Sequence, residues 1–216
     1  MPDAALATVF VVDDDEAIRH SIHWLLQSVH LTSVMFPSAQ DFLSHYSPEQ
    51  PGCLLLDVRM PGMSGLDLLD HLRANHVDIP VIIMSGHGDI PMAVRALKNG
   101  ALDFVQKPFN NQEMLDRIQC ALRLDQANRA KRLGSQDLQD RLAKLTPRER
   151  EILGHIKSGK SSKLIARELD ISPKTVDVHR IHIMRKLNIH HAVELGNFSD
   201  TLIHHDQETT GVNLPH

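Results

Sequence analysis

The sequence predicts two domains of different fold class, an α/β domain on a parallel sheet followed by a small all-α domain. Through the first 120 residues, short apolar or β-branched runs alternate five times with stretches of helical periodicity. From Thr146 onward the pattern is purely helical. The charge also changes along the chain, because residues 141–198 hold 12 Lys and Arg against 6 Asp and Glu, whereas the whole chain has 23 against 27. An acidic part is therefore joined to a basic part, a pattern compatible with nucleic-acid binding on the C-terminal side.

The composition is that of a globular protein with a substantial core. The chain has 216 residues, of which 42% are apolar. No apolar run approaches the length of a membrane span, and the start, MPDAALATVF, lacks the basic flank of a signal peptide. We therefore expect a cytoplasmic protein without a membrane partner. Cys53 and Cys120 are too few for a disulfide framework and are expected to be reduced thiols.

The predicted elements of the first domain are short and closely connected. The amphipathic helices have Ser, Asp or Pro near their starts and cover residues 15–28, 38–46, 64–74 and 89–98. The strands cover residues 8–12, 31–35, 53–57, 80–84 and 102–105. Such repetition predicts a parallel sheet with helices on both faces, as in the flavodoxin-like (βα)5 fold.

The end of the first domain is predicted from a change in helix character. A last helix begins near Asn110 and is expected to run beyond Arg129, until Gly134 and Ser135 interrupt it. The segment Thr146-Pro147-Arg148-Glu149 then has the form of a capping box, which starts a new helix. We place the α/β domain at 1–122, a partly helical linker at 123–145, the helical domain at 146–200, and a fraying polar tail at 201–216.

Carboxylates follow two of the predicted strands. The segment VFVVDDDEAIRH runs from an apolar strand into Asp13, Asp14 and Asp15, and Asp57 ends the strand CLLLD. Capping of the next helix by Asp14 or Asp15 explains one or two of these acids, but not a carboxylate at the very end of the strand. In a flavodoxin-like order the first and third strands are adjacent where ligands bind, outside their carboxyl ends. Asp13, Asp14 and Asp57 should converge there with a cation nearby, and hard oxygen ligands with room for water suit Mg²⁺.

Two further polar residues end the remaining strands of this edge. Ser85 follows the fourth strand in VIIMSGHGD, and Lys107 follows the fifth in FVQKPF. A single Asp after a strand is usually a helix cap, and a single Lys-Pro is usually a turn. Because four strands of one predicted sheet carry such residues at the same edge, we interpret them as one site.

This set of residues resembles the receiver domain of two-component response regulators, and the resemblance covers about the first 120 residues. It implies that Asp57 is a phosphoacceptor that attacks the phosphoryl group of a phosphohistidine on a sensor histidine kinase. It also implies a Mg²⁺ ion held by Asp13, Asp14, Asp57 and the backbone carbonyl of Arg59.

The resemblance assigns the other positions as well. Ser85 is the switch hydroxyl, Phe104 is the switch aromatic, and Lys107 is the cation that neutralises charge on the transferring oxygens. The peptide bond between Lys107 and Pro108 is expected to be cis. The family often has Thr in place of Ser85 and Tyr in place of Phe104, so Phe104 has no hydroxyl to anchor in the activated state. Asp15 matches no position of the phosphate site and is assigned to helix capping.

The basic half has the spacing of a helix-turn-helix, although generic helical hairpins look similar. A short helix at 162–169 is followed by a tight turn at 170–171 and by a second helix that Ser172 caps. Periodicity turns Val176, His179, Ile183 and Leu187 inward, and it turns Lys174, Asp177, Val178, Ile181 and Arg185 outward. Val178 and Ile181 are apolar on this outward face, which indicates that something covers them.

This half resembles the LuxR-type helix-turn-helix through LTPREREIL, IARELDIS and TVDVHRIHIMRKL. Together the two halves resemble response regulators of the NarL/FixJ class, which implies promoter DNA and RNA polymerase as partners and homodimers after phosphorylation. The second helix would enter the major groove. Phosphates would then be held by Lys174, Thr175, Arg180 and Arg185, with Asp177, Val178 and Ile181 near base edges.

The main hypothesis is therefore a transcription regulator, not an enzyme beyond slow loss of its own phosphoryl group. One alternative is a Mg²⁺-dependent aspartyl-phosphate hydrolase. Such hydrolases usually carry a second acid two residues after the nucleophile, where this chain has Arg59, and the chain has no segment for a cap domain. Another alternative is a receiver whose helical domain binds protein rather than DNA.

Overall fold

The computed structural model describes residues 7–86 and 90–189. It divides into two compact units, Met1–Lys131 and Arg132–His216. The predicted polar tail at 201–216 and the last part of the predicted helical domain, residues 190–200, lie outside the described residues. The predicted domain limits at residues 122, 145 and 200 stay predictions.

The first unit is built on a five-stranded parallel sheet of order β2-β1-β3-β4-β5. This confirms the flavodoxin-like arrangement and places each predicted strand within one residue of its position. The strands are β1 (Thr8–Val12), β2 (Thr32–Phe36), β3 (Gly52–Asp57), β4 (Val81–Ser85) and β5 (Asp103–Gln106).

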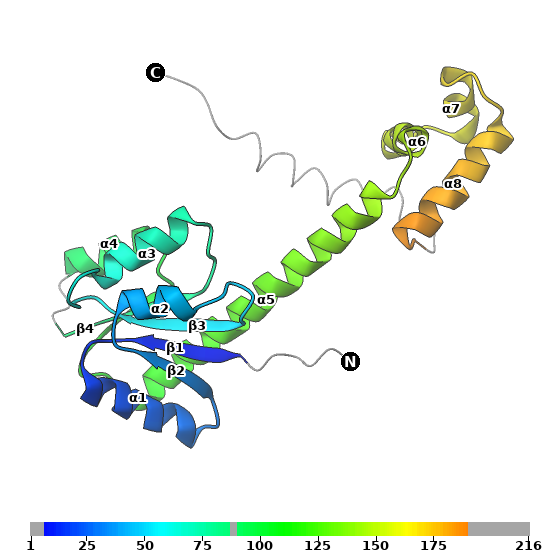
Figure 1. Cartoon of the computed structure of the whole chain (residues 1–216). Helices are drawn as coiled ribbons and strands as arrows, with labels where there is room; N and C mark the ends of the chain where they lie inside the picture. The colour runs from blue at the N-terminus through cyan, green and yellow to red at the C-terminus, as the bar shows by residue number, and fades with distance from the viewer. Residues whose placement is uncertain (1–6, 87–89, 190–216) are drawn as a thin grey trace, which may run out of the picture. The chain divides into compact units, whose positions relative to one another are not determined.

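Helices cover both faces of this sheet (Figure 1). They are α1 (Glu16–Ser28), α2 (Ala39–His45), α3 (Gly65–Ala74), α4 (Ile90–Lys98) and α5 (Asn111–Ala143). Residues of α2, α3 and α4 form one core with Phe10 and Val12, whereas residues of α1 and α5 form the other with Val9 and Val11. Strands β1, β3 and β4 are buried on both sides, which is why they read as continuous apolar runs, whereas β2 and β5 at the sheet edges are partly exposed. Cys53 is buried and Cys120 is exposed, and both are free thiols.

The predicted interruption of the last helix was wrong, because α5 continues through Gly134 and Ser135 to Ala143. A Cβ atom added to Gly134 would meet nothing within 4 Å, so this glycine lies on an open surface of the helix. A single glycine weakens a helix by only about 1 kcal/mol relative to alanine. The helix-forming residues on either side outweigh that cost.

An ion pair fixes α5 to the sheet beyond residue 122. The Asp125 carboxylate, only 2% exposed, accepts hydrogen bonds from the Gly52 backbone at 2.9 Å and from Arg129 Nε at 2.7 Å. The other guanidinium nitrogens of Arg129 donate to the backbone carbonyls of residues 48–50. The contacts of the first unit therefore reach past the predicted domain boundary.

In its described part, residues 132–189, the second unit contains the end of α5 and the helices α6 (Pro147–Lys157), α7 (Ser162–Glu168) and α8 (Pro173–Leu187). Their starts follow the sequence signals: Thr146 and Glu149 form the predicted capping box of α6, and Ser172 caps α8. The tight turn before α8 has Asp170 at a φ of 50°, a left-handed conformation that Asp tolerates better than most residues. Within the described residues, α7 and α8 therefore have the predicted helix-turn-helix arrangement.

Glu149 joins the start of α6 to the end of α8. Its carboxylate is 3% exposed, accepts from the Thr146 backbone N–H at 2.7 Å and lies 2.6 Å from the Lys186 ammonium. Burial acts to raise the pKa of Glu149, but these hydrogen bonds and the charge of Lys186 outweigh burial and lower the pKa to about 2. Because the ordinary pKa is 4.5, the pair stabilises this domain fully above that pH, and the contribution is lost as the pH falls toward 2.

Candidate functional site

The carboxyl ends of four strands meet at one edge of the sheet and carry the predicted polar residues. Asp13 directly follows β1, Asp57 ends β3, Ser85 ends β4, and Lys107 directly follows β5. The Lys107 backbone N–H donates to the Ser85 carbonyl at 2.8 Å, which joins the ends of the last two strands. The peptide bond from Lys107 to Pro108 is cis, as expected.

A buried cation joins two carboxylates at this edge. Lys107 Nζ lies 2.5 Å from Asp13 Oδ2 and 2.5 Å from Asp57 Oδ1. The side chains are 13%, 1% and 8% exposed, respectively. Burial raises the pKa of Asp13, and the hydrogen bond and charge of Lys107 oppose that rise. Burial also acts to lower the pKa of Lys107, but its bonds to the two carboxylates prevail and raise it, so the ammonium stays charged.

The remaining carboxylate oxygens accept backbone hydrogen bonds. Asp57 Oδ2 accepts from the Arg59 N–H at 2.6 Å, and Asp13 Oδ1 accepts from the Asp15 N–H at 3.0 Å. Asp15 itself caps α1, as expected, by accepting from the Ala17 N–H at 2.8 Å. The side chain of Arg59 is exposed, so this residue offers its backbone to the site.

The donor chemistry of this edge fits Mg²⁺, although Lys107 now bridges the two buried carboxylates. In the part of the chain that the structure describes, no three His, Cys, Asp or Glu side chains are grouped for a metal, and Asp14 is exposed. Mg²⁺ needs only one or two carboxylates, since water and phosphate oxygens complete its shell. Asp13 and Asp57 supply two such carboxylates at one edge, with Asp14 beside them in the chain.

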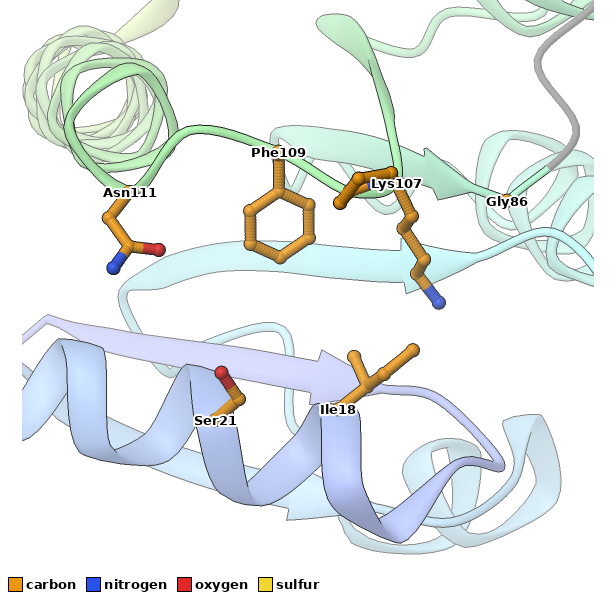
Figure 2. A pocket seen from close by; sticks show the side chains of 7 residues that line it. Ile18, Ser21, Gly86, Lys107, Phe109 and Asn111 are labelled. Carbon is orange, nitrogen blue, oxygen red and sulfur yellow. The ribbon is translucent and has the colours of Figure 1, made fainter.

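A cavity of about 460 Å³ opens beside the Lys107 side chain, between α1 and the segment that joins β5 to α5. Figure 2 shows Phe109 and Lys107 pointing toward α1, from which Ile18 and Ser21 point back. The remaining lining residues are Gly86, Pro108 and Asn111. This apolar surface was not predicted from the sequence, because single apolar residues such as Ile18 and Phe109 are common in any core.

The outward face of α8 matches the periodicity prediction in most positions. Val178 is 44% exposed and Ile181 is 57% exposed. The other predicted contact residues that are exposed are Lys174, Thr175, Asp177 and Arg185. Arg180 differs, because it is half-buried with Nη1 3.5 Å from the Ser162 hydroxyl of α7. Val176, Ile183 and Leu187 are buried as expected, whereas His179 is half-buried.

Comparison with known protein families matches both units. Residues 9–119 match the response regulator receiver domain, and residues 143–198 match the bacterial regulatory proteins of the luxR family. The chain is a two-component response regulator. Its class is NarL/FixJ, as the sequence analysis inferred, and proteins of this class are transcription regulators rather than enzymes.

Individual relatives are similar over nearly their whole length. The chain is 41% identical over 187 residues to the transcriptional regulatory protein FixJ of Bradyrhizobium diazoefficiens, covering 87% of this chain and 91% of FixJ. It is 44% identical over 192 residues to the transcriptional regulatory protein TdiR of Thauera aromatica, covering 89% and 85%. Among solved structures, the response regulator StyR has a TM-score of 0.86 at 44% identity, covering 91% of this chain and all of that chain. Within the described residues of this response regulator, no helix is long and apolar enough to span a membrane.

Replacing Lys107 tests whether the Asp13–Asp57 pair accepts a divalent cation. Lys107→Gln leaves two buried carboxylates without their cation, and we expect the receiver domain to lose about 3 kcal/mol of unfolding free energy in chelator. Added Mg²⁺ should restore more stability to this variant than it adds to the wild type, because the ion no longer competes with the ammonium. Urea unfolding with and without Mg²⁺ measures both effects.

Lys98→Gln is the matched control, since Lys98 is exposed on α4. An equal loss of stability in the two variants, or a Lys107→Gln protein indifferent to Mg²⁺, would contradict this role for the pair.

Proposed function

We propose that this response regulator is switched by phosphoryl transfer from a sensor histidine kinase to Asp57, which promotes dimerisation and promoter binding. The observation that supports it most is the bridge from Lys107 to Asp13 and Asp57, since it joins a carboxylate nucleophile to a fixed cation. The similarity to transcriptional regulators over both units supports the DNA-binding half. Because the target is promoter DNA, we also propose RNA polymerase as a partner and the cytoplasm as the compartment.

In the proposed reaction, an oxygen of Asp57 attacks the phosphorus of the donor phosphohistidine. A P–O bond forms as the P–N bond breaks, and the imidazole nitrogen leaves with the electron pair. Lys107, 2.5 Å from Asp57 Oδ1, stabilises charge on the transferring oxygens, and the Arg59 N–H holds the other carboxylate oxygen in place. Asp13, Asp14, Asp57 and the Arg59 carbonyl would hold Mg²⁺, which when bound neutralises phosphoryl charge.

The kinase is proposed to dock at the cavity beside Lys107. Ile18 and Phe109 offer apolar contact there, and Lys107 lines the same cavity. A donor seated against these residues would bring its phosphohistidine to the edge that carries Asp57. Slow hydrolysis of the acyl phosphate would return the protein to its resting state. A dedicated hydrolase is not supported, because Arg59 stands where that class usually has a second acid.

The phosphoacceptor assignment predicts labelling at one residue. The full chain incubated with radiolabelled acetyl phosphate and Mg²⁺ should take up the label, and Asp57→Asn should take up none, because the amide is not a nucleophile. Excess chelator should abolish labelling of the wild type. Undiminished label on Asp57→Asn, or on the wild type in chelator, would exclude Asp57 as the Mg²⁺-dependent acceptor.

Dimerisation is proposed to use the surface at residues 89–105, of which residue 89 lies outside the described residues. On α4, Ile90 is 80% exposed, Leu97 is 47% exposed and Val94 is 43% exposed. Apolar side chains grouped on one exposed helix face are a typical protein-binding surface. Ser85 and Phe104 are proposed to shift this surface when Asp57 carries a phosphoryl group.

The dimer proposal predicts a change in mass on activation. Sedimentation of the full chain at micromolar concentration should show monomers that become dimers with Mg²⁺ and beryllofluoride, a phosphoryl analogue. Leu97→Glu should stay monomeric because its charge would be buried unpaired. Val34→Glu, at an exposed valine of β2, is the control and should dimerise. A wild type of unchanged mass would rule the proposal out.

On α8, Lys174 and Arg185 are proposed to hold phosphates while Asp177, Val178 and Ile181 face base edges. Thr175 and the half-buried Arg180 are further proposed phosphate contacts. Val178 and Ile181 suit thymine methyl groups, and Asp177 can accept a hydrogen bond from cytosine N4.

This division of roles predicts opposite effects of two alanine variants. Arg185→Ala should weaken operator and random duplexes alike and lower the salt slope by about 1 per lost phosphate contact. Asp177→Ala should leave the affinity for random-sequence duplexes unchanged or raise it. The same variant should reduce the discrimination between bases at one operator position by ~1 to 3 kcal/mol. Arg123→Ala, exposed on α5, is the control. If Asp177→Ala preserves the ranking of single-base operator variants, Asp177 does not read sequence.

A further inference from the structure

Helix α4 is held to the sheet by few side chains. Ala96 is its one fully buried residue among those described, and Met92, one turn earlier on the same side, is half-buried against the same core. Its larger apolar side chains, Ile90, Val94 and Leu97, are exposed. A helix with so small a buried face is displaced at low cost, so each contact on that face matters for its position.

Met92 provides one of these contacts to the switch hydroxyl. The Ser85 Oγ, at the buried end of β4, donates to Met92 Sδ at 3.8 Å. A thioether is a weak acceptor, and this bond gives a buried hydroxyl a partner on α4. One hydrogen bond of the Ser85 hydroxyl is therefore directed to α4.

Met92 and Phe104 pack against the same core cluster. Phe104 of β5 lies opposite Ile83 of β4 in the sheet and packs, half-buried, against the core cluster that contains Ile83 and Ala96, against which Met92 also packs. Any inward turn of Phe104 must be accommodated by its neighbours in this cluster. Methionine suits such a place, because its unbranched side chain has three rotatable bonds and changes shape easily.

We propose that Met92 is a positioning residue of the switch, which holds the Ser85 hydroxyl on the α4 side until Asp57 is phosphorylated. The inference rests on the proposed function, in which Ser85 responds to the phosphoryl group on Asp57. The hydroxyl exchanges a weak bond to sulfur for a charge-assisted bond to a phosphoryl oxygen. Helix α4 thereby loses a contact to β4, and the surface with Ile90, Val94 and Leu97 is free to shift.

The test compares two substitutions of Met92 in the full chain. Met92→Leu keeps the apolar volume but removes the acceptor, so the resting state is weakened and beryllofluoride should bind about threefold more tightly, the low end of what a lost hydrogen bond is worth. Met92→Gln retains an acceptor oxygen, and its affinity should equal or fall below that of the wild type. Calorimetric titration with Mg²⁺ and excess fluoride measures the dissociation constants.

A double-variant cycle separates positioning from simple packing. In a Ser85→Ala background, Met92→Leu should no longer change beryllofluoride affinity, because the hydroxyl is absent. Met114→Leu, at a buried methionine of α5 in the other core, should behave as the wild type. Thermal midpoints check that each variant is folded, and Met92→Ile repeats the test if Met92→Leu is not.

Affinity of a folded Met92→Leu protein equal to or below that of the wild type would overturn the inference. So would the same gain in the Ser85→Ala background, because Met92 would then act without Ser85. If the wild type binds no beryllofluoride with Mg²⁺, the proposed function fails, and the inference fails with it. The two failures are thus distinguishable.

Discussion

The bridge from the Lys107 ammonium to the carboxylates of Asp13 and Asp57 is the interaction on which the receiver domain depends. Two buried carboxylates so close together are stable as anions only with a cation between them. The parallel order of β1, β3, β4 and β5 makes the bridge possible, because it brings their carboxyl ends to one edge. The same edge then has carboxylate oxygens and a fixed cation in one place, which is what the proposed phosphoryl transfer requires.

The two helices α5 and α4 near this bridge differ in how firmly they are held to the sheet. Helix α5 is fixed to the sheet by Asp125 and Arg129, whose bonds reach the start of β3 and the carbonyls before it. Helix α4 has only Ala96 fully buried and so has less to hold it. We therefore expect a change of charge at Asp57 to move α4 more readily than α5, because α4 is less firmly packed.

The DNA-binding unit depends on a different charged pair. Glu149 closes the capping box of α6 and binds Lys186 at the end of α8, so one buried carboxylate fixes α6 and α8 together. Among the residues that the structure describes, the outward face of α8 is exposed. Its apolar residues, Val178 and Ile181, are then available to a partner.

The sequence by itself determined the strands, most helices and the residues at the sheet edge. Hydrophobic periodicity, helix-capping residues and strand ends are signals that neighbouring residues carry. Asp13, Asp57, Ser85 and Lys107 each end a strand or directly follow one. It did not predict that α5 passes through Gly134, because the cost of one exposed glycine is settled by its neighbours.

Only the tertiary structure decided which atoms meet. It turned Arg180 toward Ser162, paired Arg129 with Asp125 and the loop before β3, and set Met92 beside Ser85. These contacts join residues on different elements, and their distances follow from how helices pack on the sheet and on one another. Periodicity assigns a residue to a face of its own helix, but it does not identify the neighbour which that face meets.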